Sequence, residues 1–199
     1  MSSIKEEKEI NNNDLNDKNL IYKIEIATQT LDRNIGFITN CDNKTSIALA
    51  SFGVLLVIIL TNEGLNEIFN IIKSCIIANN LYCTLFLICF LGAIFLMGLG
   101  MFNLGSVLVA KTSEEAIGRK DENSRIFFAG IRKSGDYNIF YEKFYTMSKE
   151  ELLSDLIEQI YINADIASIK YKTYNLGIKR TIKGFVSFVF LFLVGIFVF

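Results

Sequence analysis

Three long apolar stretches alternate with charged segments along the chain. Residues 45–61, 81–110 and 185–199 contain no Asp, Glu, Lys or Arg and are rich in Leu, Ile, Val and Phe. At ~1.5 Å per residue, helices of these lengths approach or exceed the ~30 Å hydrocarbon layer of a bilayer. The last stretch is short, which local thinning of the bilayer would accommodate. We predict three transmembrane helices; the alternative, a soluble all-α core, would need more polar covering surface than the chain has.

Heptad-like spacing extends from the first and third stretches into the charged regions. One series of four- and three-residue steps comprises Leu20, Ile24, Ala27, Leu31, Asn34, Ile38 and Cys41. A second series follows a capping box, Ser148-x-x-Glu151, and comprises Leu153, Ile157, Ile160, Ala164, Ala167, Tyr171, Tyr174 and Ile178. Such spacing is typical of helices that pack on other helices, with Asn34 as a device that fixes register. It predicts two helices that each run unbroken into a span.

The predicted fold is an all-α integral membrane protein with three transmembrane helices and a cytoplasmic helical stalk, two stalk helices being continuous with the first and third spans. A disordered polar tail (1–17) precedes a single domain (18–199). Within the domain we expect a cytoplasmic helix (18–44), the first span (45–61), an outer interfacial helix or loop (62–80), the second span with its extension (81–110), a cytoplasmic linker (111–147), a cytoplasmic helix (148–184) and the last span (185–199). Tight helix contacts are expected at small residues, namely Ser46, Ala50, Gly53, Gly98 and Gly105.

The distribution of basic residues predicts the orientation. Six Lys and Arg residues precede the first span, one follows it, thirteen lie between the second and third spans, and none follows the third. The positive-inside rule therefore places the N-terminus and the central region in the cytoplasm, and Phe199 outside the inner membrane. The length of the helical seams suggests a homo-oligomer.

The pattern of residues 62–80 has two possible interpretations. Its apolar residues recur at helical spacing, at Leu65, Ile68, Phe69, Ile72 and Ile76, while Glu63, Asn66, Glu67, Asn70 and Lys73 occupy the other side. This pattern fits an amphipathic helix on the outer leaflet, or a plain connecting hairpin.

Composition excludes several classes of function. The chain has no His, so it cannot use imidazole for acid–base catalysis or metal binding. The near-balanced charge gives no support to nucleic-acid binding. The four cysteines lack C-x-x-C spacing, and we interpret them as small apolar residues. No nucleophile–base or carboxylate pair stands out, so we expect no enzyme activity, no catalytic residue, no metal and no cofactor.

Asp42 and Lys44 lie at the boundary of the first span. An anion is unexpected near an anionic leaflet, so we expect Asp42 to have a cationic partner, with Arg33, Lys44 or a residue near Lys183 as candidates. These two residues have two possible roles: an interfacial salt bridge, or a direct role in ion passage or gating.

Basic and aromatic residues are interleaved after the second span. The candidate ligand-binding residues are Arg125, Phe127, Phe128, Arg132, Lys133 and Tyr137. Guanidinium and ammonium groups can hold a phosphate, and aromatic rings can stack on a base. The alternative is that the two Phe residues pack on the stalk and the cations are solvated. Residues 125–137 could form a strand and turn, or a loop.

The chain resembles the membrane effectors of bacterial Pycsar antiphage systems over roughly residues 20–199. The features that match are Asp42, Lys44 and Gly53 at the first span, Phe127, Phe128, Gly130, Ile131 and Tyr137 after the second, and Asp155, Gln159, Ile160, Ile166, Lys170 and Tyr171 on the helix that runs into the last. Their order around three spans carries the resemblance.

The resemblance implies a function and partners. A neighbouring pyrimidine cyclase would make cyclic UMP or cyclic CMP, and this activating ligand would cause the effector, as a stand-alone domain, to impair inner-membrane integrity and abort the infection. Two alternatives remain: a related two-helix membrane defence effector with a different nucleotide signal, and a structural or transport-associated membrane protein without a ligand.

Overall fold

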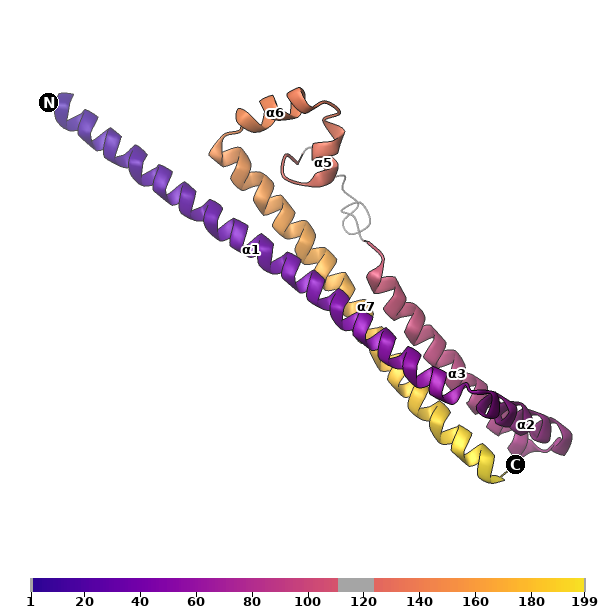
Figure 1. Cartoon of the computed structure of the whole chain (residues 1–199). Helices are drawn as coiled ribbons and strands as arrows, with labels where there is room; N and C mark the ends of the chain where they lie inside the picture. The colour runs from indigo at the N-terminus through magenta and orange to yellow at the C-terminus, as the bar shows by residue number, and fades with distance from the viewer. Residues whose placement is uncertain (1, 111–123, 199) are drawn as a thin grey trace. The chain divides into compact units, whose positions relative to one another are not determined.

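The computed structural model describes residues 2–110 and 124–198, and the side chains from residue 15 onward within these ranges (Figure 1). Its helices are α1 (Ser2–Ile59), α2 (Asn62–Ala78), α3 (Leu81–Leu108), α5 (Phe128–Lys133), α6 (Tyr137–Tyr145) and α7 (Lys149–Val198). The described ranges contain no strand. Helices α1, α3 and α7 are each long and apolar enough to cross a membrane. The all-α fold with three candidate spans is therefore confirmed.

The chain forms two compact units. The polar unit contains residues 1–39 and 111–169, and the membrane unit contains residues 40–110 and 170–199. Two of the three boundaries between the units, after residues 39 and 169, fall inside α1 and α7, so each of these helices supplies residues to both units. Helix α1 begins at Ser2, without a break at residue 17. Disorder of the first 17 residues, and the cytoplasmic location of the polar unit, stay predictions.

The predicted seam of α1 is confirmed. Ala27 and Cys41 are buried, and the other five positions of the series are half-buried, while most residues between them are exposed. Asn34 donates a hydrogen bond from Nδ2 to the carbonyl of Ile160 at 3.1 Å, which ties α1 to α7 within the polar unit. A polar contact of this kind penalises a shift of one helix along the other, because the amide would lose its acceptor.

The predicted seam of α7 is wrong in part. Ile157 is 55% exposed, and the buried residues Leu156, Gln159, Ile166 and Lys170 lie one position earlier than the predicted ones. The error has a physical cause, since two members of the true seam are polar. Because the prediction was based on apolar residues alone, it selected the apolar neighbours of these two polar residues instead.

The capping box that starts α7 is confirmed. The hydroxyl of Ser148 accepts from the N–H of Glu151, and the carboxylate of Glu151 accepts from the N–H of Ser148, both at 3.1 Å. Each interaction satisfies a backbone donor that the helix itself cannot satisfy.

Helices α3 and α7 approach each other closely in the membrane unit, at positions that the sequence analysis missed. A Cβ atom added to Gly100 would lie 2.4 Å from the backbone N of Thr181, and one added to Gly184 would lie 2.4 Å from that of Met97. The expected contacts at Gly98, Gly105 and Gly53 are wrong, because an added Cβ there meets nothing within 4 Å, and Ser46 and Ala50 are exposed. Gly98 and Gly100 differ by ~200° around a helix, so only one of them can face α7.

Aromatic and apolar residues fill the rest of the core of the membrane unit. Phe90 of α3 and Phe188 of α7 are buried, with ring centroids 5.4 Å apart. Ile71 and Cys75 of α2 are buried in a cluster with Cys83 of α3. This cluster holds α2 against the α3–α7 pair.

Segment 62–80 contains a helix, α2, which has one apolar side on the protein and one apolar edge exposed. Thr61 caps its start, Asn79 ends it in the left-handed region at φ 40°, and Asn80 caps α3. Ile71 and Cys75 are buried, whereas Phe69 is 67% exposed and Ile76 is also exposed. An exposed apolar edge beside a polar side is typical of a helix that lies in the membrane interface.

A single tryptophan can test the position of α2, because the chain contains none. We expect Phe69→Trp to show blue-shifted fluorescence in vesicles and quenching by brominated acyl chains, since the exposed edge would enter the lipid. Glu67→Trp, two residues away and therefore on the opposite, polar side of the helix, is the matched control and should be quenched much less. Equal quenching of the two would favour the plain hairpin.

Candidate functional site

Residues 124–148, which precede α7, contain two short helices, α5 and α6, and not the strand that was one of the alternatives. The hydroxyl of Ser124 accepts from the N–H groups of Ile126 and Phe127, at 3.3 and 3.0 Å, and so shapes the turn before α5. Gly135, at φ 76°, supplies the left-handed residue that separates α5 from α6. Asp136 then caps α6 by accepting from the N–H of Asn138 at 2.7 Å.

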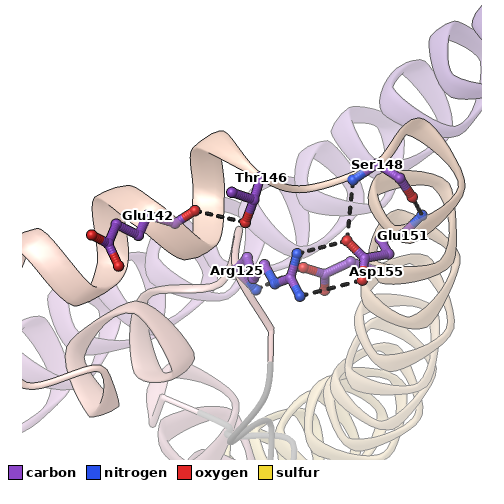
Figure 2. A network of polar contacts seen from close by, with 6 residues as sticks. All are labelled: Arg125, Glu142, Thr146, Ser148, Glu151 and Asp155. Atoms are coloured by element: carbon purple, nitrogen blue, oxygen red, sulfur yellow. Dashed lines mark hydrogen bonds and ion pairs between the residues drawn. The ribbon is translucent and has the colours of Figure 1, made fainter.

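Arg125 is anchored at the start of α7 (Figure 2). Its guanidinium donates to a carboxylate oxygen of Glu151 at 2.8 Å, and its backbone N–H donates to Asp155 at 2.7 Å. The guanidinium of Arg125, and then the N–H of Ser148, lower the pKa of the Glu151 carboxyl, so this group is ionised at neutral pH. Thr146, whose hydroxyl donates to the carbonyl of Glu142, closes the end of α6 nearby.

A pocket of roughly 370 Å³ lies among these elements, and we call it the basic pocket. It is lined by Ser124, Arg125, Gly130, Lys133, Ser134, Phe140 and Lys143. Its volume falls within the range of ~300–1,000 Å³ that is usual for small-molecule sites. Three cations and two hydroxyls provide donors for a phosphate, and the Phe140 ring provides a face for a base. A smaller pocket of about 210 Å³ that Arg125 also lines contains three carboxylates, which disfavour an anion.

The structure separates the six predicted ligand-binding residues. Arg125 and Lys133 line the basic pocket. Arg132 and Tyr137 line a different pocket of about 200 Å³. The rings of Phe127 and Phe128 lie 4.5 Å apart, Phe128 is 70% exposed, and neither residue lines a described pocket.

Five residues line the basic pocket but were not among the six candidate ligand-binding residues, namely Ser124, Gly130, Ser134, Phe140 and Lys143. Lys143 and Phe140 are three residues apart on α6, so they share a face of the helix. Recognition of the Asp136 cap would have predicted this helix and paired the two residues.

A second polar site, in the membrane unit, joins three helices. The ammonium of Lys170 on α7 lies 2.6 Å from a carboxylate oxygen of Asp42 on α1 and 2.8 Å from the carbonyl oxygen of Val107 on α3. Val107 is in the last turn of α3, where carbonyls lack a donor within the helix. We call these three residues the Lys170 junction.

The partner predicted for Asp42 is therefore corrected. Arg33, Lys44 and a residue near Lys183 were the candidates, whereas the structure pairs Asp42 with Lys170. The side chain of Lys44 is exposed. A salt bridge at this position is present, and a part for Asp42 or Lys44 in ion passage or gating stays a prediction.

Comparison with known proteins adds the family. The family model described as the Pycsar effector protein domain matches residues 26–199. The Pycsar effector protein GmPycTM of Gulbenkiania mobilis is 28% identical over 204 residues, which cover 93% of this chain and 100% of that protein. No solved structure matches. With three helices that can cross a membrane, the chain belongs to the Pycsar effector family of antiphage membrane effectors.

Proposed function

We propose that this protein responds to a cyclic pyrimidine mononucleotide from a partner cyclase and then impairs inner-membrane integrity, which causes abortive infection. The family implies a cyclase-derived cyclic nucleotide signal and a membrane location. In this proposal the polar unit is cytoplasmic and the C-terminus is outside, in line with the distribution of Lys and Arg.

The basic pocket is the observation that carries the proposal. A cyclic mononucleotide presents one anionic phosphodiester, which Arg125, Lys133 and Lys143 can hold by charge-assisted hydrogen bonds. The hydroxyls of Ser124 and Ser134 can bind the ribose, and the Phe140 ring can stack on the base. At roughly 370 Å³ the pocket is near the lower limit for small-ligand sites, which favours a mononucleotide over an oligonucleotide.

The response would start at the beginning of α7. Arg125 belongs to the pocket and is bound to Glu151 and Asp155 in the first two turns of this helix. A ligand in the pocket would thus favour one arrangement of this end of α7 over another. Since α7 extends from Lys149 to Val198, we propose that rotation or clustering of the spans in a homo-oligomer then disrupts the bilayer.

Titration calorimetry on the full chain in nanodiscs tests the ligand. We expect binding heat with cyclic UMP or cyclic CMP and none with cyclic AMP at the same concentrations, because the proposed signal is a pyrimidine nucleotide. The absence of heat with both pyrimidine nucleotides would contradict the proposal.

A recording of membrane potential tests the consequence. Cells that contain the effector and a uridylate or cytidylate cyclase should depolarise during phage infection. An unchanged potential together with intact defence would refute membrane impairment.

A further inference from the structure

The Lys170 junction contains a cation that is buried far more completely than its anion. The side chain of Lys170 is 4% exposed, whereas that of Asp42 is 34% exposed. Lysine is almost never so buried unless it is paired. Lys170 therefore depends on Asp42 for its charge balance, while Asp42 retains access to solvent.

The surroundings offer few substitutes for this pairing. Cys41 and Thr45 flank Asp42 on α1 and are fully buried, and the Thr45 hydroxyl already donates to the carbonyl of Cys41 at 2.8 Å. The second acceptor of Lys170 is the neutral carbonyl of Val107, which cannot balance a charge. Loss of Asp42 would leave an uncompensated buried cation held by one neutral oxygen.

A buried ion pair is a weak source of net stability but a strong selector of one arrangement. Replacing the whole pair with apolar groups is often tolerated, whereas removal of one partner is strongly destabilising. The junction also uses one ammonium to fix three helices, so any relative movement of α1, α3 or α7 breaks at least one of its two contacts.

We propose that the Lys170 junction is an autoinhibitory latch that holds α1, α3 and α7 of the membrane unit in the resting arrangement. Release of this latch is the step that lets the spans disrupt the bilayer. The proposal rests on the membrane-impairing function proposed above, and it goes beyond that function by naming the contact that keeps the resting protein silent.

The unequal burial makes the two single variants behave differently. Asp42→Asn leaves the buried ammonium of Lys170 without a counter-charge. This should shift the equilibrium between the resting and the released arrangement by roughly a hundredfold toward release, which brings a 1:99 ratio of released to resting protein to about even. Lys170→Met removes both contacts of the latch but strands no buried charge, because water can reach the Asp42 carboxylate, so it should release the spans less strongly than Asp42→Asn. The double variant Asp42→Asn/Lys170→Met has neither the latch nor a buried charge and should behave as Lys170→Met.

The test uses cells that contain the full-length effector and no cyclase. Membrane potential is recorded with a voltage-sensitive dye, and the amount of effector in the membrane fraction is measured for each variant. Asp42→Asn should depolarise the cells without any signal, and the double variant should depolarise them to a smaller extent. Lys172→Gln removes an exposed charge from α7 two residues away and should behave as the wild type.

A second pair of variants covers the case in which Asp42→Asn does not accumulate. Lys170→Asp places two carboxylates at the junction and should depolarise cells, and Asp42→Lys combined with Lys170→Asp should depolarise them less, because it restores the ion pair but not the hydrogen bond to the Val107 carbonyl. If cells with normal amounts of Asp42→Asn or Lys170→Asp in the membrane stay polarised, this result contradicts the proposed latch. Depolarisation by wild-type effector together with its cyclase tests the proposed function separately, so the two failures are distinguishable.

Discussion

Gly184→Ala is expected to disrupt the membrane unit, with a loss of about 3 kcal/mol in the free energy of unfolding. The added methyl would lie 2.4 Å from the backbone N of Met97 and 2.7 Å from its Cα, so no side-chain rotation can relieve the clash. Helices α3 and α7 would have to separate and lose packing such as that between Phe90 and Phe188. Gly100→Ala should act in the same way, because its methyl would meet the backbone of Thr181.

The matched control is Gly98→Ala, two residues from Gly100 on the same helix. An added Cβ there meets nothing within 4 Å, and alanine forms helix better than glycine, so stability should be unchanged or slightly higher. Unfolding of the purified variants in mixed micelles with increasing SDS, followed by circular dichroism, gives the comparison. Equal midpoints for Gly98→Ala and Gly184→Ala would show that α3 and α7 do not pack at these glycines.

Lys143→Glu is expected to reduce affinity for the cyclic nucleotide by at least about thirtyfold, since loss of one partner of a close charge pair at an interface typically costs ~2–5 kcal/mol. Lys143 lines the basic pocket from α6, so the variant places a carboxylate beside the bound phosphate. Titration calorimetry with the nucleotide that binds the wild type measures the loss. The amount of cyclase needed to depolarise cells should rise in parallel.

Two further charge reversals locate the site. Arg132→Glu changes the pocket of about 200 Å³ that Arg132 and Tyr137 share, and it should reduce affinity little if the basic pocket holds the ligand. Lys23→Glu changes an exposed position on α1 in the polar unit and should leave affinity as in the wild type. A large loss with Arg132→Glu and none with Lys143→Glu would move the site to the smaller pocket.

Hydrophobic periodicity predicted those features of the fold that depend on a single helix. The spans follow from uncharged length, and the α1 seam from Ala27 to Cys41 follows from its steps of four and three residues. The Ser148–Glu151 box is a local motif whose two hydrogen bonds need no tertiary partner. In each case the determining interaction lies within one helix or along one face of it.

Features that depend on which face meets which neighbour were harder to predict. Nothing in the composition near Gly98 and Gly100 indicates which one faces α7, because that choice depends on the rotation of α3 in the bundle. Lys170 contributes to the family resemblance, but its pairing with Asp42 joins residues 128 positions apart and requires a polar side chain inside the seam.

The candidate ligand site was predicted only as a stretch of chain. Arg125 and Lys133 were selected because they are basic and near aromatic residues, and the structure places both in one pocket. Phe127 and Phe128 met the same criterion and line no described pocket. The distinction follows from the turn at Ser124 and the helix that Asp136 caps, both of which depend on short hydrogen bonds rather than on periodicity.

Glu151 makes two contacts, and this affects how the protein would respond to a ligand in the basic pocket. One carboxylate both caps α7 and binds the guanidinium of Arg125. A phosphate in the basic pocket would compete with Glu151 for that guanidinium, so a gain of contact with the ligand would be a loss to the first turn of the helix. Fraying at residues 148–151, visible as faster amide hydrogen exchange, would then report the bound state directly.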